Sequence, residues 1–210
     1  MNICKVILVG ESGVGKTCIM LRFVQNRFDK NMISTIGASY VNKIYKFNLN
    51  DKEENLQFMI WDTTGQEKYR ALTRNFYIGT HVAILVYDSN IRESFEKIKD
   101  FWYNEIIEHC SKDIIIALAG NKFEDLMNIK ISEEEGKKFA EENNMIFQCT
   151  SALTSLGIND LFKDIGKTYI KEIYLNKNMK NNADEELKKQ EDKKLNLNNS
   201  KNNKKKKKFC

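Results

Sequence analysis

The 210-residue sequence lacks several features by which whole classes of protein are recognised. It contains no uninterrupted apolar run of about eighteen residues, so no membrane-spanning helix is expected. Its N-terminus leads directly into an apolar, strand-like segment, so no signal peptide is expected either. Proline is absent altogether. We attribute this, with the high asparagine and lysine content, to a compositional bias and infer no function from it.

Cysteine and histidine are too few and too scattered to suggest a metal centre. The five cysteines are odd in number and form no C-x-x-C pair, so neither a metal cage nor a disulfide framework is expected. This usage is typical of a reducing compartment. The two histidines, His81 and His109, fall at strand-edge or helical positions, and we expect no catalytic or metal-binding role for either. The cysteines are Cys4, Cys18, Cys110, Cys149 and Cys210.

Charge is divided unevenly along the chain, whose net charge is +5. Residues 176–210 hold twelve lysines against five acidic residues, a net +7, which leaves 5 − 7 = −2 for residues 1–175. The apolar content of 41% is enough for one well-packed domain with an appendage. The sequence therefore predicts a mildly acidic globular domain over 1–175 and a basic tail over 176–210, rather than a nucleic-acid-binding domain.

Strand-like and helical patterns alternate along residues 1–175. Strands are predicted over 5–9, 40–47, 56–61, 81–88, 114–119 and 145–150, with a polar turn over 48–55. A helix is predicted over 18–24, and a capping box of Ser132 and Glu135 opens another. Apolar residues at helical spacing mark two more helices, one with Phe95, Ile98, Trp102 and Ile106, and one with Ile158, Leu161, Phe162, Ile165 and Tyr169. This alternation predicts an α/β fold with a mostly parallel, six-stranded sheet and helices on both faces.

The segment 10–17, Gly-Glu-Ser-Gly-Val-Gly-Lys-Thr, fits the phosphate-binding pattern G-x-x-x-x-G-K-[ST]. It lies between the first predicted strand and the helix 18–24, an arrangement that points consecutive backbone N–H groups and a helix N-terminus at one anion. Its glycines allow positive φ angles and close approach of the backbone. We expect Lys16 to reach the β- and γ-phosphates and the Thr17 hydroxyl to bind Mg²⁺.

Four polar segments each follow a predicted strand, namely 10–17, 62–66, 121–124 and 150–152. In a mostly parallel sheet the ligand binds beyond the carboxyl ends of the strands. These segments are therefore expected to meet at one edge of the sheet and to form one binding site. The polar stretch 25–39 is also expected to be functional, because long loops in compact domains usually are.

Five motifs together resemble the nucleotide-binding motifs of Ras-type small GTPases in order and spacing. They are GESGVGKT at 10–17, STIG at 34–37, WDTTGQE at 61–67, GNK at 120–122 and TSA at 150–152. The segments IGASY at 36–40 and KYRALTRNFYIG at 68–79, with a lysine tail that ends in cysteine, resemble the Rab branch. The resemblance covers residues 1–175 and implies the P-loop GTPase fold, whereas the tail matches in style only.

The resemblance implies that the site binds GTP or GDP with Mg²⁺ and hydrolyses GTP slowly. The hydroxyls of Thr17 and Thr35 would bind the ion, Thr35 only while a γ-phosphate is present. Asp62 would hold it through a water molecule. The Gly65 backbone N–H would meet the γ-phosphate, and Gln66 would orient the attacking water. The catalytic residues implied in this way are Lys16, Gly65 and Gln66.

At the base, Phe28 would pack against the ring, and Asn121 and Lys122 would brace the base-binding loop. Ala152 would offer its N–H to the guanine oxygen. Guanine also presents two adjacent donors that one carboxylate can accept together, so Glu124 is expected to preserve a preference for guanine. Further nucleotide contacts implied by the resemblance are Gly13, Val14, Gly15, Cys18 and Ser151.

The sequence departs from the family pattern at four positions. Thr64 stands where Ala is usual, Met32 where many members have Tyr, and Leu153 where Lys is usual. Glu124 stands where Asp is usual, although an aspartate follows as Asp125. Counting back from the next helix cap reaches Glu124, so we interpret it as a substitution rather than an insertion. The competing interpretation is that Asp125 reads the base.

The resemblance also implies partners and a location. An exchange factor, a GTPase-activating protein and effectors would bind through 31–40 and 64–79, and the protein would be a monomer. Prenylation of Cys210, together with the lysines at 204–208, would hold it on an anionic membrane surface. The expected location is the cytoplasm and the cytosolic face of an intracellular membrane, with no nucleic-acid partner.

Two other functions compete with a GTPase switch. A nucleotide-retaining adaptor that hydrolyses negligibly would serve as a static binding module. The presence of Gln66 and Thr35 argues against it, whereas Thr64 and Glu124 keep it open. An ATP-using P-loop kinase is poorly supported, because WDTTGQE lacks the lid arginines that such enzymes need.

Overall fold

The computed structural model describes residues 2–30, 35, 38–49, 52–63 and 75–175. The chain divides into two units, 1–169 and 170–210. In the second unit the described residues, 170–175, are helical. The expected boundary between a globular domain over 1–175 and a tail over 176–210 stays a prediction. Across the described part of the chain, no helix is both long enough and apolar enough to cross a membrane.

The first unit is built on a six-stranded sheet, counted over the described residues. Its strand order is β2-β3-β1-β4-β5-β6, in which β2 and β3 are antiparallel and the other neighbouring pairs are parallel. The predicted α/β fold class is therefore confirmed. The strands are β1 (Asn2–Val9), β2 (Ala38–Leu49), β3 (Lys52–Thr63), β4 (Val82–Asp88), β5 (Ile115–Asn121) and β6 (Ile146–Cys149).

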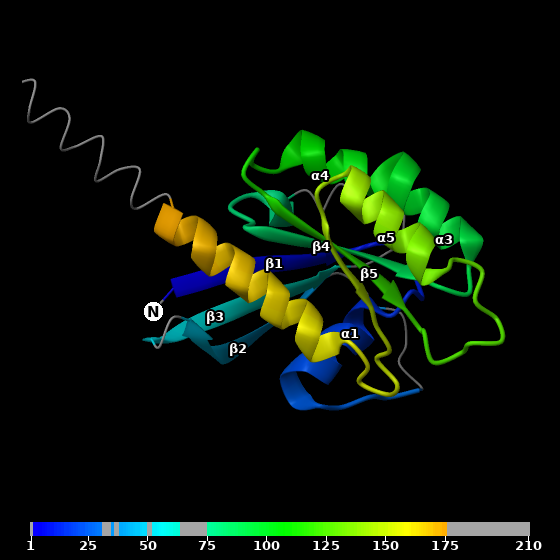
Figure 1. Cartoon of the computed structure of the whole chain (residues 1–210), viewed down its shortest axis with the longest axis horizontal. Helices are drawn as coiled ribbons and strands as arrows, with labels where there is room; N and C mark the ends of the chain where they lie inside the picture. The colour runs from blue at the N-terminus through cyan, green and yellow to red at the C-terminus, as the bar shows by residue number, and fades with distance from the viewer. Residues whose placement is uncertain (1, 31–34, 36–37, 50–51, 64–74, 176–210) are drawn as a thin grey trace, which may run out of the picture. The chain divides into compact units, whose positions relative to one another are not determined.

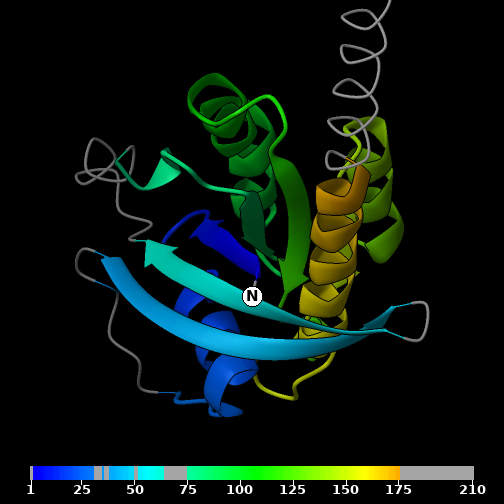
Figure 2. The ribbon, with the colours of Figure 1, turned by 90° about the vertical axis from the view of Figure 1, so that its left-hand side faces the viewer.

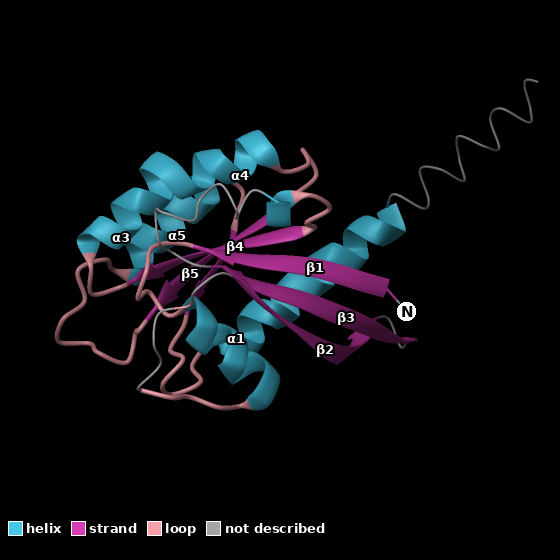
Figure 3. Ribbon diagram, turned by 180° about the vertical axis from the view of Figure 1, so that it is seen from behind, coloured by secondary structure: helices cyan, strands magenta, loops and turns pink. Residues whose placement is uncertain are grey.

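Helices cover both faces of this sheet (Figures 1 and 3). Helices α3, α4 and α5 lie together on one side, and α1 lies on the other. The last helix of the first unit occupies residues 158–169. The other bounds are α1 (Lys16–Gln25), α3 (Arg92–Lys97), the π-helical turn η2 (Ile98–Trp102), α4 (Tyr103–His109) and α5 (Glu133–Glu142).

Each face of the sheet has its own apolar core, because side chains alternate between the two faces of a strand. On the α3–α5 side, Ile7, Leu85 and Tyr87 join the helix residues in one buried cluster. The four residues predicted at helical spacing over 95–106 are all buried there. On the α1 side, Phe23 stacks on Phe162 with ring centroids 3.7 Å apart.

The predicted turn over 48–55 is wrong. Strands β2 and β3 continue to Leu49 and Lys52, which are paired in the antiparallel register. Figure 2 shows the two strands beside each other along their whole length. The polar composition of this stretch is typical of a turn, but two tertiary contacts favour the hairpin. Phe47 is buried over Gly166, and Lys46 pairs with Glu53 across the strands at 2.9 Å.

The capping box predicted for α5 forms in part. The Ser132 hydroxyl accepts a hydrogen bond from the Glu135 backbone N–H at 3.2 Å, as an N-cap should. The Glu135 carboxylate, however, pairs with both terminal nitrogens of Arg92. This tertiary ion pair connects the start of α5 with the start of α3.

Glycine at position 136 of α5 makes room for the buried side chains below it. A Cβ atom here would collide with the Tyr87 hydroxyl and lie 2.8 Å from the Phe147 ring. Because Tyr87 is fully buried, its ring cannot easily move aside. We expect Gly136→Ala to lower the free energy of unfolding by up to about 2 kcal/mol, since overpacking costs about 1–3 kcal/mol and the gain in helix propensity is about 1 kcal/mol.

Urea unfolding of the purified protein measures this effect. Lys138→Ala, an exposed substitution in the same helix, is the matched control and should change stability by less than about 0.5 kcal/mol. If Gly136→Ala is more stable than the parent, the gain in helix propensity outweighs the cost of overpacking and the packing argument is wrong.

Candidate functional site

A cleft of about 260 Å³ lies beyond the carboxyl ends of β1, β3 and β5. The loop after β6 completes its wall, so segments from all four predicted polar motifs meet there. This is the position at which open α/β sheets bind ligands. The cleft is lined by Ser12, Gly13, Gly15, Lys16, Thr17, Cys18, Phe28, Asp29, Lys30, Thr35, Thr63, Asn121, Lys122, Glu124, Ala152 and Leu153.

The phosphate-binding loop depends on glycine at two close contacts. Gly10 and Gly15 have φ angles of 144° and 99°, values that other residues rarely adopt. A Cβ at Gly10 would collide with the Val86 carbonyl oxygen, and one at Gly15 would collide with the Asn121 side-chain nitrogen. The loop therefore packs against β4 and β5. Helix α1 begins within the 10–17 segment, at Lys16.

Lys16 lies inside the loop rather than on its surface. Its Nζ donates to the carbonyl oxygens of Gly10 and Glu11, each at 2.8 Å. Burial lowers the pKa of Lys16 to about 8, although the nearby carboxylates of Asp62 and Glu11 act in the opposite direction. The loop thus holds one desolvated positive charge next to a helix N-terminus, where an anion is favoured.

Three oxygen-bearing side chains come together beside Lys16. The Thr17 hydroxyl donates to Asp62 Oδ2 at 2.5 Å and lies 2.7 Å from the Thr35 hydroxyl. Thr35 also donates to Asp62 Oδ2, at 3.2 Å. These are the residues that the resemblance assigns to Mg²⁺, and they come from α1, the 25–39 segment and β3.

The electrostatics of Asp62 fit a bound cation. Its carboxylate is fully buried, and burial raises its pKa while the bonds from Thr17 and Thr35 act against that shift. Asp62 Oδ1 has no hydrogen-bond partner among the residues that the structure describes. Two hydroxyls and a carboxylate are hard oxygen donors of the kind that Mg²⁺ prefers. The residues present therefore fit the ion.

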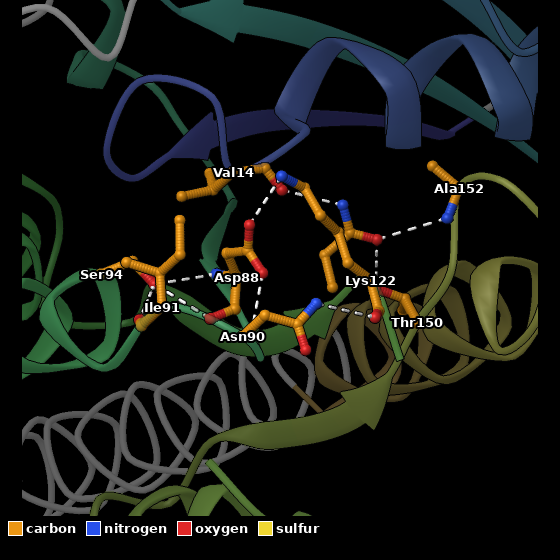
Figure 4. Close-up of polar contacts among 9 residues, drawn as sticks. Val14, Asp88, Asn90, Ile91, Ser94, Lys122, Thr150 and Ala152 are labelled. Carbon is orange, nitrogen blue, oxygen red and sulfur yellow. Dashed lines mark hydrogen bonds and ion pairs between the residues drawn. The ribbon is translucent and has the colours of Figure 1, made fainter. Parts of the chain in front are cut away.

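Asn121 joins the loop 10–17 to the segment after β6 through three hydrogen bonds, whose partners Val14, Thr150 and Ala152 are labelled in Figure 4. Its Nδ2 donates to the Val14 carbonyl at 2.8 Å. Its Oδ1 accepts from the Thr150 hydroxyl and from the Ala152 N–H, each at 3.3 Å. One buried amide thus fixes three segments that are far apart in the sequence.

Lys122 is held in an unusual backbone conformation. Its φ angle is 67°, in the left-handed region that non-glycine residues seldom adopt. Its Nζ forms a 2.6 Å ion pair with the buried Asp88 carboxylate (Figure 4). Such strain persists where the surroundings enforce it, commonly at functional sites.

Glu124 and Asp125 face different surroundings. Glu124 lines the cleft, and its Oε2 is buried without a hydrogen-bond partner in the described ranges. Asp125 is exposed, and both of its carboxylate oxygens accept from Asn128 Nδ2 at 3.0 Å. Of these two carboxylates, that of Glu124 belongs to a residue that lines the cleft and that of Asp125 does not.

The remaining site residues predicted from the sequence fall into three groups. Gly13, Cys18 and Phe28 line the cleft. Val14 and Ser151 are buried beside it, and the Ser151 hydroxyl accepts from the Thr154 N–H at 3.0 Å. The other predicted positions lie outside the described residues, namely Met32, Thr64, Gly65, Gln66 and Cys210.

Comparison with known proteins agrees with this geometry. The sequence model of the Ras family matches residues 5–171. The chain belongs to the Ras family. Its relatives place it in the Rab branch. Ras-related protein Rab-22A of Homo sapiens is 41% identical over 164 residues, which cover 78% of this chain and 81% of the relative.

Two relatives from Dictyostelium discoideum are similar to this Rab-family chain to the same degree. Ras-related protein Rab-5A is 42% identical over 164 residues, covering 78% of this chain and 79% of the relative. Ras-related protein Rab-2B is 38% identical over 181 residues, covering 86% of this chain and 87% of the relative. The predicted family is therefore confirmed.

Several residues of this Rab-family site were not expected from the sequence. The sequence predicts Asp88 only as the end of a strand, yet it is the ion-pair partner of Lys122. Tyr40, Trp61 and Phe76 form an aromatic group. The ring centroid of Trp61 lies 4.8 Å from that of Tyr40 and 5.1 Å from that of Phe76. Because these three residues are far apart in the sequence, no local pattern predicts that they meet. The sequence indicates only that each lies within or beside a predicted partner-binding segment.

Proposed function

We propose that this chain is a Rab-type GTPase that binds GDP or GTP with Mg²⁺, hydrolyses GTP slowly and acts as a switch in membrane traffic. The observation that carries the proposal is the cluster of Thr17, Thr35 and Asp62 at the mouth of the phosphate-binding loop. Membership of the Ras family, whose members are GTPases, supports it.

At the phosphate end, Lys16 and the backbone N–H groups of the loop would bind the β- and γ-phosphates. Thr17, Thr35 and Asp62 would hold Mg²⁺, which when bound would supply positive charge beside the reacting phosphate oxygens. Thr35 would bind the ion only in the GTP state, because its contact with Mg²⁺ would depend on the γ-phosphate. Gly65 would then meet the γ-phosphate through its N–H, and Gln66 would orient the attacking water.

At the base end, the proposed ligand is guanine. The Glu124 carboxylate would accept the two adjacent donors of the base, and Phe28 would cover the ring. The Ala152 N–H would donate to the guanine oxygen. In support, that N–H makes only a long bond of 3.3 Å to Asn121, so it could turn to a better acceptor.

Partner binding would change with the nucleotide through segments 31–40 and 64–79. An exchange factor, a GTPase-activating protein and effectors are the proposed classes of partner. The aromatic group of Tyr40, Trp61 and Phe76 supports this surface, because it joins parts of both segments across β3. Tyr40 is partly exposed there, at 39%.

The proposed location is the cytosolic face of an intracellular membrane, with prenylated Cys210 as the anchor. One lipid chain binds a membrane only marginally. Each lysine near an anionic leaflet contributes about 1 kcal/mol, so the five lysines at 204–208 could contribute up to about 5 kcal/mol. Together the two signals would make binding stable.

Thr17→Ala tests the proposed Mg²⁺ site. Removing this hydroxyl should lower the Mg²⁺ affinity of the GDP-bound protein by at least about 10-fold, because even indirect supporting groups contribute about 10- to 100-fold. The measurement is the rate of release of fluorescent GDP against free Mg²⁺ concentration. In the parent, chelation of Mg²⁺ should speed GDP release strongly. In the variant, a much higher free Mg²⁺ concentration should be needed to slow GDP release.

Thr80→Ala is the matched control for this experiment. It removes a buried hydroxyl that donates to the Phe76 carbonyl at 2.8 Å, and it does not line the cleft. Its Mg²⁺ dependence should equal that of the parent. A parent protein whose GDP release does not respond to Mg²⁺ would contradict the proposed function.

A further inference from the structure

Arg22, in the last turn of α1, makes four hydrogen bonds that connect two distant parts of the chain. Its Nε donates to the Ala152 carbonyl at 2.8 Å, and its Nη2 donates to the Leu153 carbonyl at 3.0 Å. Its Nη1 donates to the backbone and side-chain oxygens of Asn26, at 3.0 and 3.2 Å. One guanidinium thus binds the end of α1 and a loop about 130 residues away.

The loop that Arg22 holds is part of the cleft wall. Ala152 and Leu153 both line the cleft, and the Ala152 N–H is directed to Asn121 (Figure 4). Of the two contacts, the bond from Arg22 to the Ala152 carbonyl is the shorter, at 2.8 Å against 3.3 Å for the bond from the Ala152 N–H to Asn121, so Arg22 holds the Ala152 peptide while its N–H can still reach a ligand. The guanidinium also lies 5.9 Å from the centre of the Phe28 ring, which lines the same cleft.

A simpler explanation is that Arg22 only caps its helix. Basic side chains near a helix C-terminus bind its last carbonyls and favour the helix dipole. The two bonds to Asn26 are of this kind. The bonds to Ala152 and Leu153 are not, because those carbonyls belong to another segment, and a capping role does not require them.

We propose that Arg22 is a positioning residue that holds the 152–153 loop, and with it the Ala152 N–H, at the guanine base and so slows nucleotide release. The inference rests on the proposed function and adds a determinant of nucleotide retention to it. A planar guanidinium can direct separate N–H groups to two neighbouring carbonyls, which an ammonium group cannot do in the same geometry. Because the bond at 153 is to the backbone, it is made equally well with Leu in that position.

The test is the release of fluorescent GDP from the full-length, Mg²⁺-loaded protein. Arg22→Gln should release GDP about 10-fold faster than the parent, equivalent to about 1.4 kcal/mol. Arg22→Lys keeps the charge at the helix end, and its GDP release should be slower than that of Arg22→Gln but still faster than that of the parent. Arg27→Gln removes an exposed arginine beyond the end of the same helix, and its rate should equal that of the parent.

A second nucleotide separates positioning from general destabilisation. The diphosphate of 2-aminopurine riboside lacks the oxygen that the Ala152 N–H would bind. It also lacks the N1–H donor, so each variant is compared with the parent carrying the same nucleotide. If Arg22 acts through Ala152, Arg22→Gln should speed the release of GDP clearly more than the release of this analogue. A purely structural role would speed both equally and lower the melting temperature.

Two results would overturn the inference alone. One is a parent that retains GDP while Arg22→Gln and Arg22→Lys both release it at the parental rate. The other is an equal acceleration for GDP and the analogue. A parent that fails to retain GDP at all would refute the proposed function, and this inference with it.

Discussion

Glu124→Ala is expected to weaken GDP binding by about 10²-fold or more, because the two charge-assisted hydrogen bonds that it would lose contribute about 1.5–3 kcal/mol each. ADP binding should change little, since adenine offers an acceptor where guanine offers a donor. The ratio of GDP to ADP affinity should therefore collapse. Titration of each nucleotide into nucleotide-free protein measures both constants.

Asp125→Ala is the matched control for this prediction. It removes a neighbouring carboxylate that is exposed and accepts from Asn128, so the preference for guanine should persist. Glu124→Asp shortens the side chain by one methylene and should tighten GDP binding by about 10-fold if the loop has not adapted to glutamate. Loss of guanine preference in Asp125→Ala alone would show that Asp125 reads the base.

Gln66→Leu should leave GDP binding intact and abolish most of the hydrolysis that an activating protein stimulates. No arginine lies in residues 31–35, so no guanidinium is supplied there to stabilise the transition state. A partner's arginine should therefore accelerate hydrolysis by about 10³- to 10⁵-fold, but only if Gln66 orients the attacking water. The nucleotide should consequently accumulate as GTP in the variant.

The measurement is hydrolysis of prebound GTP in the presence of a stimulating cell fraction. Lys138→Ala, which changes an exposed residue of α5, should respond as the parent does. If Gln66→Leu is stimulated as strongly as the parent, Gln66 does not have the proposed role.

The fold class and the position of the loop 10–17 between a strand and a helix could be predicted because their signals are local. Apolar residues at fixed spacing reveal a strand or helix face, and the pattern of the loop lies in eight consecutive residues. The family resemblance supplied the register of the other motifs. The confirmed sheet then explains why segments so far apart in the sequence share one cleft.

Contacts that depend on the assembled sheet could not be predicted in the same way. Strands β2 and β3 are longer than predicted, and Phe47 near the end of β2 packs over Gly166, a contact that no local pattern reveals. The bonds from Arg22 to Ala152, and from Lys122 to Asp88, join residues whose neighbours give no indication of a partner. The resemblance predicts that Lys122 braces a base-binding loop, whereas the fold supplies the Asp88 carboxylate that pairs with it.

Single-turnover hydrolysis by the purified parent protein, with GTP and ATP in parallel and with Mg²⁺ present or chelated, tests the central claim most directly. We expect hydrolysis of GTP alone, dependent on Mg²⁺, at about 10⁻⁴ to 10⁻² s⁻¹ without a partner. Stable retention of GTP with no hydrolysis, even with a stimulating cell fraction, would instead indicate a static nucleotide-bound adaptor. Turnover of ATP, or of GTP at several per second unaided, would contradict the account outright.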